Sequence, residues 1–562
     1  MLGLTNSFYG DDPSENFTFS SMQRWLSAEF EGSGIRSEIA AWIPGDFSKL
    51  SIDDIKQHLL SELSVNKPKD LSDKGSYEEK FLNFLFTLDL LPSYAFPRHV
   101  CAFQIERRID TYKRIETVES PQQNLSTALT EYAVGRLVVV NKKTYKVGTI
   151  AAKTPNTEKD RASPLFAKKR QYLQCSNCLF TEIFNENSPN RYNCTHCGSD
   201  EMEVLDVIQP EVVYPSGRDY INEFDDDDLY TSATAAQLPF MGESTDQNWS
   251  NFKHASQIIS QENQLLVTIN KGEESSTGQS GFWVCSSCGK ATAEKEKPQG
   301  PHERDYFVFQ QSENTKCSGT YERVNTGYSF NSDVFILRLP LDFPMMQMGP
   351  SIDKDGLITA ARTLSEAILK EASIQLEIDP SEMNCGIRFL KINKINYLDI
   401  FIYDTASGGA GYANMTGLFF GSIFSGVAKL LRRNDCCNTS CYRCLQHYGN
   451  RWHHNNLDKK YGLMLWRKIN DDVLPNLYTS SEQMVLSSSL QKLMALEGWT
   501  INQNGDDGLL AQNGEKKISL VIYPVLLDQR FVKNEIEKID VCISDFEIEK
   551  SLPSAYLKIT SA

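Results

Sequence analysis

Four cysteines are spaced so that they can bind one metal ion together. Cys175, Cys178, Cys194 and Cys197 follow the pattern C-x2-C-x15-C-x2-C. Each C-x2-C pair forms a tight knuckle whose sulfurs point the same way, and two such pairs supply the four thiolates of a tetrahedral zinc ion. The segment between the pairs is long enough for a β-hairpin to return. We predict a zinc ribbon at about residues 170–203, against the alternative of four unrelated core cysteines.

A second donor set combines three cysteines with one histidine. Its members are Cys285, Cys288, His302 and Cys317. Three thiolates and an imidazole satisfy a structural zinc site. Gly289 and Gly319, which follow cysteines, suit backbone corners with positive φ. The sequence predicts a second ribbon-like module at about 281–323. The alternative places His302 in a surface loop and leaves the fourth ligand undefined.

A third donor set is the densest in the chain. It consists of Cys436, Cys437, Cys441 and Cys444. The last two form a C-x2-C pair, but neighbouring side chains such as the first two diverge in most backbone conformations. His447 is therefore an alternative ligand in place of one of them. The lone cysteines Cys101, Cys385 and Cys542 stand in apolar or strand-like surroundings and are predicted to be core residues.

The charge of the chain limits how it can hold nucleic acid. The formal net charge is −16, which excludes a surface that is basic throughout, because binding to phosphates relies on Lys and Arg. Local basic patches and nearby aromatic residues are the candidate DNA contacts: Lys168, Lys169, Arg170, Arg432, Arg433, Tyr448 and Trp452, with Tyr442 as a further base-stacking candidate. The alternative is that the charges are only solvated and the aromatic residues are core.

Two places offer metal-dependent chemistry as an alternative. Asp404 ends a predicted strand and enters a glycine turn before a long helix, where it could share a metal with His453 or His454. In the C-terminal tail, four residues resemble pieces of a metal-dependent nuclease site: Asp506, Asp507, Glu515 and Lys517. A capping aspartate and a polar hairpin tip explain the same residues without catalysis.

The signatures of a helicase motor are missing from the sequence. A motor holds ATP phosphates with a Gly-Lys-Ser/Thr loop and magnesium with a D-E-x-D or D-E-x-H box. Neither pattern occurs, and the Gly289-Lys290 pair belongs to a predicted zinc knuckle. We therefore predict that the chain has no ATPase of its own and is not an enzyme.

The elements that must position these residues follow from hydrophobic periodicity. A length of 562 residues suggests about three or four domains. Residues 1–115 are predicted to be mainly helical, and 116–330 to be β-rich with the two ribbon-like modules inserted. Residues 331–475 combine helices and strands in an α/β core that carries the third donor set, and 476–562 form a small α/β tail. The predicted class is multidomain α+β.

Targeting signals are also missing from the sequence. Its first segment lacks the basic start and apolar core of a signal peptide, and no apolar run approaches the roughly 18 residues of a membrane span. We expect a soluble, cytoplasmic protein without membrane contact. In a reducing compartment its cysteines bind metal rather than form disulfides.

Several separated motifs resemble a known family. The runs FIYDTASGGAGYANM, CCNTSCYRCLQHYGN and HNNLDKKYGL are similar, in this order, to the MrfA-like zinc-binding domain. That domain lies at the C-terminus of DEAD/DEAH-type superfamily 2 helicases and in DrmB, a component of the DISARM phage-defence system. Upstream, LLPSYAFPRHV and LTEYAVGRLVVVNKKTYKVGTI are similar to the region that joins the ATPase lobes to the domain. The resemblance covers most of residues 85–470.

The resemblance implies a function for the chain. Zn²⁺ would bind at the third donor set, where the family usually has four cysteines. The adjacent pair of cysteines departs from that pattern, and the chain lacks the Arg-Ser-Gln opening expected of DrmB. We predict a non-catalytic accessory subunit of a DEAD/DEAH-type helicase or translocase that supports DNA binding, most plausibly in bacterial phage defence. The alternatives are a metal-dependent nuclease or other DNA-processing enzyme, and a scaffold without DNA contact.

Overall fold

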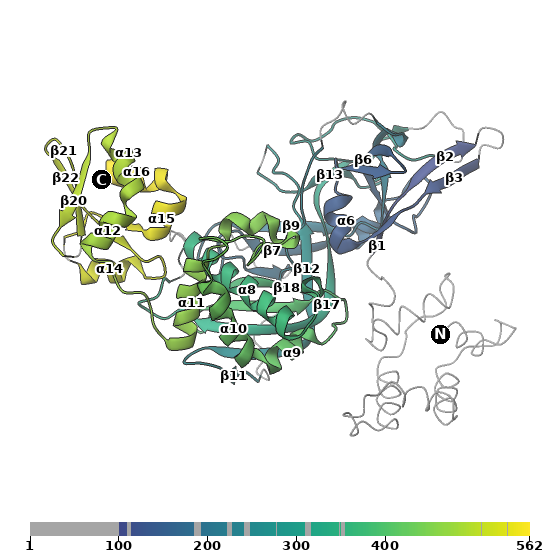
Figure 1. Ribbon diagram of the computed structural model, residues 1–562. Coiled ribbons are helices and arrows are strands. Elements are labelled where there is room, and N and C mark those ends of the chain that lie inside the picture. The colour runs from purple at the N-terminus through teal and green to yellow at the C-terminus, as the bar shows by residue number, and fades with distance from the viewer. Residues whose placement is uncertain are drawn as a thin grey trace, which may run out of the picture. The chain divides into compact units, whose positions relative to one another are not determined.

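The computed structural model divides the chain into two units, Met1–Phe96 and Pro97–Ala562 (Figure 1). It describes residues 100–562 except 110–113, 185–192, 222–227, 241–247, 277, 309–315, 348, 350–353, 507 and 537. The side chains of Arg114 and Trp452 are also outside the described part. The first unit, on which most of the predicted helical region falls, lies outside the described residues. None of the helices in the described part combines the length and apolar character that crossing a membrane requires.

A five-stranded sheet comes first in the described chain, in the order β4-β1-β10-β6-β5. Its strands are β1 (Val100–Phe103), β4 (Gln122–Asn124), β5 (Leu137–Val140), β6 (Lys143–Ala151) and β10 (Val212–Pro215). The turn between β5 and β6 has φ of 49° at Asn141 and 64° at Lys142, as a two-residue hairpin turn requires. Beside the sheet lie the hairpin β2 (Ile105–Ile109) and β3 (Arg114–Glu119), the helices α6 (Leu125–Glu131) and α7 (Ser163–Ala167), and the 3-10 turn η3 (Ser216–Arg218).

A ten-stranded sheet forms the centre of the second unit. Its main path is β11-β12-β17-β9-β7-β8, and β13, β14, β18 and β19 branch from it. The bounds are β7 (Arg170–Cys175), β8 (Thr181–Ile183), β9 (Met202–Ile208), β11 (Ser250–Asn251), β12 (Gln257–Asn270), β13 (Phe282–Cys285), β14 (Ala291–Thr292), β17 (Tyr321–Pro340), β18 (Met383–Ile392) and β19 (Ile395–Asp404). A separate two-stranded ladder joins β15 (His302–Glu303) to β16 (Lys316–Cys317).

The long strand β17 connects two regions that the sequence analysis assigned to different domains. Its start pairs with β13, from Tyr321↔Cys285 to Val324↔Phe282. Its end pairs with β19, from Val334↔Tyr403 to Pro340↔Tyr397. The predicted domain boundary at residue 330 thus falls inside one continuous strand. The β-rich region and the following core share a sheet.

Helices cover the β17-β19-β18 part of the sheet (Figure 1). They are α8 (Asp355–Gln375), α9 (Tyr412–Leu418), α10 (Phe420–Arg432) and α11 (Lys459–Asp471), with the 3-10 turns η4 (Pro380–Glu382) and η5 (Tyr448–Asn456). Helix α8 buries Leu357, Leu364 and Ile368 in the same apolar cluster as Leu398 and Ile400 of β19. Burial of these aliphatic side chains is the main force that holds the helix on the strands.

A buried charge cluster ties the three strands together. Asp399 of β19 is opposite Arg338 of β17 and Arg388 of β18 in the two ladders. Its carboxylate accepts bonds of 2.7 Å and 2.9 Å from Arg338 and one of 3.0 Å from Arg388. Burial raises the pKa of Asp399, but the bonds and charges of the two guanidinium groups outweigh it, so that the pKa lies below its ordinary value.

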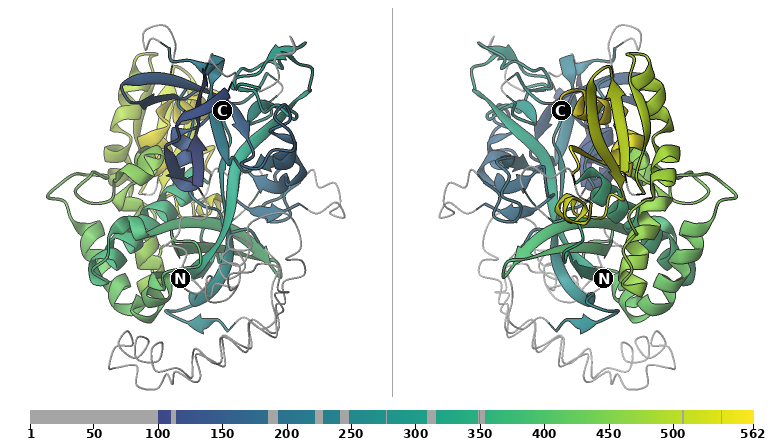
Figure 2. Two further views of the ribbon diagram at one scale, coloured as in Figure 1. Left: turned by 90° about the vertical axis from the view of Figure 1, so that its right-hand side faces the viewer. Right: turned by 90° about the vertical axis from the view of Figure 1, so that its left-hand side faces the viewer.

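The C-terminal region is a further α/β element (Figure 2). Its sheet has the order β20-β21-β22-β23, with the last pair parallel. The strands are β20 (Thr500–Asn504), β21 (Gly508–Asn513), β22 (Lys516–Tyr523) and β23 (Val541–Ser544), and the helices are α12 (Ser480–Leu486), α13 (Ser488–Ala495), α14 (Gln529–Glu535), α15 (Asp545–Lys550) and α16 (Leu552–Thr560). The predicted multidomain α+β class is confirmed.

Candidate zinc centres and nucleic-acid interface

The first donor set forms a zinc-ribbon geometry. The Sγ atoms of Cys175 and Cys197 are 3.6 Å apart, and those of Cys178 and Cys194 are 3.5 Å apart. Sulfurs around a tetrahedral zinc ion lie about 3.8 Å from one another. All four residues are buried and their sulfurs converge on one point. The donor set therefore fits zinc.

Both knuckles of this first centre are closed by backbone hydrogen bonds. Leu179 N–H donates to the carbonyl of Cys175 (3.0 Å), and Gly198 N–H donates to that of Cys194 (2.8 Å). The pKa of the Cys178 thiol is raised far above its usual value. The largest cause is the sulfur of Cys175, followed by the other neighbouring cysteine sulfurs and then by burial. A divalent cation removes this penalty, because it stabilises the thiolates.

The first centre is also attached to the helix-covered part of the sheet. The carbonyl of Cys178 accepts a bond from Phe389 N–H (3.4 Å), and His196 Nδ1 accepts one from Lys391 N–H (2.7 Å). The rings of His196 and Phe180 lie 3.9 Å apart. The ribbon is thus fastened to β18 by hydrogen bonds to its main chain.

The second donor set also converges, and His302 belongs to it. Cys285 and Cys317 sulfurs are 3.8 Å apart, and His302 Nε2 lies 3.2 Å from the Cys288 sulfur. His302 and Cys317 are directly paired across the β15-β16 ladder, which explains how residues far apart in sequence reach one site. The surface-loop alternative for His302 does not agree with this geometry.

The two glycines of the second centre have different roles. Gly289 has φ of +83°, and a Cβ there would lie 1.9 Å from the carbonyl oxygen of Ile150. Gly319 is not among the residues with positive φ, so the prediction for it was wrong. A Cβ at Gly319 would instead lie 2.7 Å from the sulfur of Cys285. The second glycine is needed because the site is crowded.

The third donor set brings the two adjacent cysteines to one point. The Sγ distances are 3.7 Å for Cys436 to Cys437, 3.6 Å for Cys437 to Cys444 and 3.8 Å for Cys441 to Cys444. His447 Nε2 lies 3.0 Å from Glu366 and is not part of the converging group, so the predicted exchange of a cysteine for this histidine is not what the structure favours. Three of the four cysteines are only half-buried.

A lysine that the sequence analysis did not single out supports the third set. Lys459 is 2% exposed. Its Nζ donates to the carbonyls of Cys437 (2.7 Å) and Arg433 and lies 3.9 Å from the sulfur of Cys436. Its charge offsets part of the negative charge that four thiolates leave around one zinc ion. The motif HNNLDKKYGL contains this residue, but a lone lysine carries no spacing signal.

Comparison with known families agrees with this geometry. Residues 364–445 match the family described as the MrfA Zn-binding domain. The matched stretch runs from α8 to the residue after Cys444 and includes the whole third donor set. The chain contains a MrfA Zn-binding domain. The predicted resemblance and zinc as cofactor are confirmed.

Longer similarities extend beyond the MrfA Zn-binding domain. The chain is 30% identical to Druantia protein DruE of Escherichia coli (strain UMEA 4076-1) over 609 aligned residues, covering 99% of this chain and 33% of that protein. It thus spans about a third of the length of this relative. A crystal structure of the DUF1998 helicase MrfA bound to DNA matches with 10% identity and a TM-score of 0.34, over 74% of this chain and 39% of that one. A further crystal structure of the DUF1998 helicase MrfA gives 9% identity and a TM-score of 0.23, over 70% of this chain and 38% of that one.

The basic patch before the first ribbon is paired with acidic residues. Lys169 Nζ lies 3.2 Å from Asp206 and 3.5 Å from Glu322. Lys168 lies 3.7 Å from Glu211, and Arg170 donates to the hydroxyl of Ser329. Since nearby carboxylates reduce the field that a phosphate would experience, the patch is less cationic than the sequence implies.

The second basic patch lies at the end of α10. Arg433 donates to both oxygens of Asp435, at 2.6 Å and 2.9 Å. The guanidinium of Arg432 lies 5.6 Å from the ring centre of Trp466. Both arginines are exposed. Of this pair, Arg433 has its charge partly cancelled by Asp435.

The aromatic candidates around the MrfA Zn-binding domain are exposed rather than core. Tyr442 is 69% and Tyr448 is 67% exposed, while the side chain of Trp452 lies outside the described part of the chain. The guanidinium of Arg451 stacks 4.0 Å from the ring centre of Tyr448. The sequence analysis missed Arg451, although an arginine three residues after an aromatic residue in a helical turn is a signal for such a stack.

Asp404 serves as a structural cap. It is fully buried, and its carboxylate accepts bonds from the backbone N–H groups of Ala410 (2.6 Å), Tyr412 (3.2 Å) and Ala413 (2.8 Å). Burial raises its pKa, although these backbone bonds lower it. His453 and His454 form no metal-binding group with it among the described residues. The arrangement closes the glycine turn onto α9.

The acidic residues of the tail are too far apart to share a metal ion. Asp506 lies in the turn before β21, and Glu515 lies in the turn after it. The six residues of β21 place these turns about 20 Å apart. Asp507 lies outside the described residues. The hairpin-tip explanation therefore fits Asp506 and Glu515 better than a nuclease site.

Proposed function

We propose that this chain is a zinc-containing, non-catalytic part of a superfamily 2 DNA helicase or translocase, and that it helps the motor to hold DNA. The observation that carries the proposal is the MrfA Zn-binding domain at residues 364–445. MrfA, the protein in the name of that domain, is a DUF1998 helicase that has been crystallised with DNA. The motor itself would come from a DEAD/DEAH-type partner, because this sequence lacks the ATP-binding loop and the acidic box.

The similarity to a Druantia protein supports a place in bacterial phage defence. It covers nearly the whole chain, whereas a DISARM assignment rests on the shared domain alone. We therefore propose a Druantia-type rather than a DISARM-type system, acting on DNA in the cytoplasm.

The surroundings of the third donor set support a role in DNA contact. This set is half-exposed, and exposed tyrosines and arginines surround it. Base-stacking aromatics beside cations are the features with which proteins hold single strands without reading their sequence. Tyr442, Tyr448 and Arg451 are the residues that we propose for this role.

Co-purification of the tagged chain with a candidate DEAD/DEAH-type helicase tests this function. DNA affinity and DNA-stimulated ATP hydrolysis are measured with and without this chain. We expect a stable complex whose affinity or ATPase rate depends on the chain, and on the third centre in a Cys441→Ser, Cys444→Ser variant. Absence of a complex, together with DNA cleavage by the chain alone that is lost in Asp404→Ala or Glu515→Ala, would overturn the proposal.

A further inference from the structure

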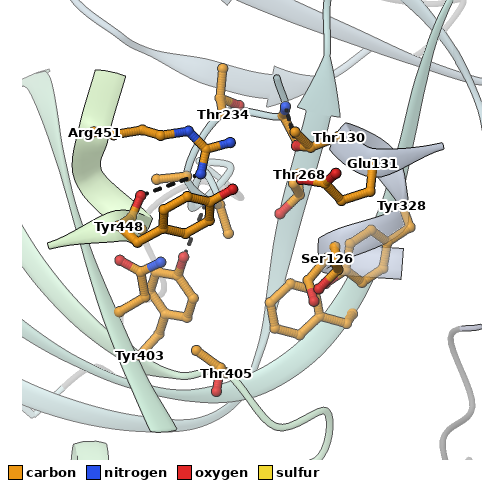
Figure 3. A pocket seen from close by; sticks show the side chains of 17 residues that line it. Ser126, Thr130, Glu131, Thr234, Thr268, Tyr328, Tyr403, Thr405, Tyr448 and Arg451 are labelled. Atoms are coloured by element: carbon orange, nitrogen blue, oxygen red, sulfur yellow. Dashed lines mark hydrogen bonds between the residues drawn. The ribbon is translucent and has the colours of Figure 1, made fainter. Parts of the chain in front are cut away.

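A pocket lies between α6, the central sheet and η5 (Figure 3). Its volume is about 280 Å³. Helix α6 contributes Ser126, Thr130 and Glu131, and η5 contributes Tyr448 and Arg451. Strands β12, β17 and β19 supply the residues between these two walls. The pocket thus adjoins the exposed aromatic residues that follow the third donor set.

The floor of the pocket is aromatic. Tyr328 and Phe330 of β17 have ring centres 5.3 Å apart and planes at 20°. The ring of Tyr403 lies 6.4 Å from that of Phe330. All three are less than a tenth exposed. These buried rings, two of which carry a hydroxyl group, form a rigid surface on which a flat ligand can stack.

The walls carry neutral hydrogen-bonding groups. Thr268, Thr405, Asn384 and Ser126 line the pocket. Two of the inner hydroxyls are held in place, because Tyr403 accepts a bond from Ala236 N–H and Thr130 accepts one from Ala233 N–H, each of 3.1 Å. Neutral donors and acceptors around an aromatic floor suit a flat, uncharged ligand with several polar edge atoms. A nucleobase has these properties.

The mouth of the pocket combines stacked tyrosine and arginine side chains with ion pairs. Figure 3 shows Arg451 and Tyr448 across the pocket from Thr130 and Glu131. Arg451 donates to the hydroxyl of Tyr230, and the ring of Tyr230 also lies 4.2 Å from the guanidinium of Arg136. Among the described residues, Glu131 lines the pocket and Asp228 lies near it, and both carboxylates pair with Arg136. Stacked tyrosine and guanidinium planes are platforms on which an unpaired base can lie.

We infer that this pocket binds one unpaired nucleobase, with Tyr448 and Arg451 as its entrance. This inference rests on the proposed function where the base belongs to a DNA strand. A free nucleotide would present the same base. The pocket would hold one base of a single strand while neighbouring phosphates remain outside.

Fluorescence anisotropy with two oligonucleotides of equal length tests the inference. One is single-stranded oligothymidine, and the other has the same phosphates with abasic residues. We expect the protein to bind the first about 5- to 140-fold more tightly, the range of base stacking on one aromatic site. Ser126→Trp, at an exposed position of α6, should block the pocket and remove most of this preference, and Tyr448→Ala should reduce it. Ser489→Trp, the same change at an exposed position of α13, should retain it.

Thymidine monophosphate, titrated by calorimetry, separates the two sources of the base. Equal binding of both oligonucleotides, or a preference that survives in Ser126→Trp and in Tyr448→Ala, would overturn the pocket and leave the proposed DNA role intact. Binding of the mononucleotide that Ser126→Trp abolishes, without oligonucleotide binding, would keep the pocket and overturn the DNA role. Binding of none of these ligands would overturn both.

Discussion

The first two donor sets and the third differ in how far they are closed from solvent. We call the first two the closed centres, because seven of their eight donors are buried, and the third the open centre, because three of its four are half-exposed. The first closed centre is hydrogen-bonded to β18, and the second brings β13 of the ten-stranded sheet together with the separate β15-β16 ladder, as expected of a structural zinc site. The open centre has exposed tyrosines and arginines around it. The same kind of zinc site thus stabilises the fold at the closed centres and holds exposed side chains in place at the open centre.

Removing a ligand should separate the two kinds of centre most strongly. Cys178→Ser is expected to lower the melting temperature much more than Cys441→Ser, because structural zinc binding is worth about 10 kcal/mol or more to a fold that depends on it and the Cys178 knuckle is bonded to β18. Thermal denaturation with zinc analysis measures both. Equal losses in the two variants would remove the distinction.

The buried charge cluster of Asp399, Arg338 and Arg388 should have the next largest effect on stability. Asp399→Asn leaves two buried guanidinium groups without their anion, and breaking a buried ion pair typically costs about 3–5 kcal/mol. The pKa of Asp399 is lowered in the fold. Its contribution to the free energy of unfolding is therefore present at neutral pH and is lost as the pH falls through this lowered pKa. Urea denaturation measures the effect.

Asp435→Asn is the matched control for Asp399→Asn, because its pair with Arg433 is exposed. It should have little effect on unfolding. A similar loss of stability in both variants would mean that burial of the cluster is unimportant.

Zinc retention at the open centre should depend on Lys459. Lys459→Met removes a buried cation beside the thiolates, and loss of such an outer-shell partner typically weakens metal binding about 10- to 100-fold. Chelator competition, with the released zinc counted per chain, measures this affinity. Lys460→Met is the control, since Lys460 pairs with Asp545 and Glu549 instead. Release from all centres alike would contradict the assignment.

Mild acid should weaken the surroundings of the open centre. Burial, followed by the charge of Arg362, lowers the pKa of His453 to about 4. Since an unfolded histidine titrates near 6.5, stability is full above that pH and falls towards pH 4, by about 2 kcal/mol at pH 5. His453→Gln should flatten this dependence in denaturation experiments, whereas His254→Gln, at an exposed position, should not. An unchanged slope in His453→Gln would rule out His453 as the source.

The sequence predicts the parts of these sites that are local. Each C-x2-C knuckle is defined by four consecutive residues, so spacing alone finds it. The placement of His302 depends on its register opposite Cys317, and the convergence of Cys436 with Cys437 depends on a loop conformation. Neither follows from spacing. The role of Lys459 could be recognised only from its contacts in the fold, whereas the three-residue spacing of Tyr448 and Arg451 is a local signal.

The pairing of strands that are distant in the sequence could not be predicted either. The predicted hairpin around Asn141 and Lys142 is local and is present. The boundary at residue 330 instead depended on a change in composition along the chain. Strand β17 continues through this change in composition, because its two ends pair with β13 and β19. Register is set by partners distant in sequence, which periodicity does not reveal.

Strand β17 gives the molecule a mechanical property. Its 20 residues run from the second closed centre to β19, a strand within the matched residues 364–445. Strand β17 is also paired with β12 from Thr326 to Arg338. A pull along its axis therefore loads many interstrand hydrogen bonds together in shear rather than opening them one by one. Tension that enters at one end of β17 would reach the other end with little stretching, so a load applied to one of these regions would be passed to the other through a single strand.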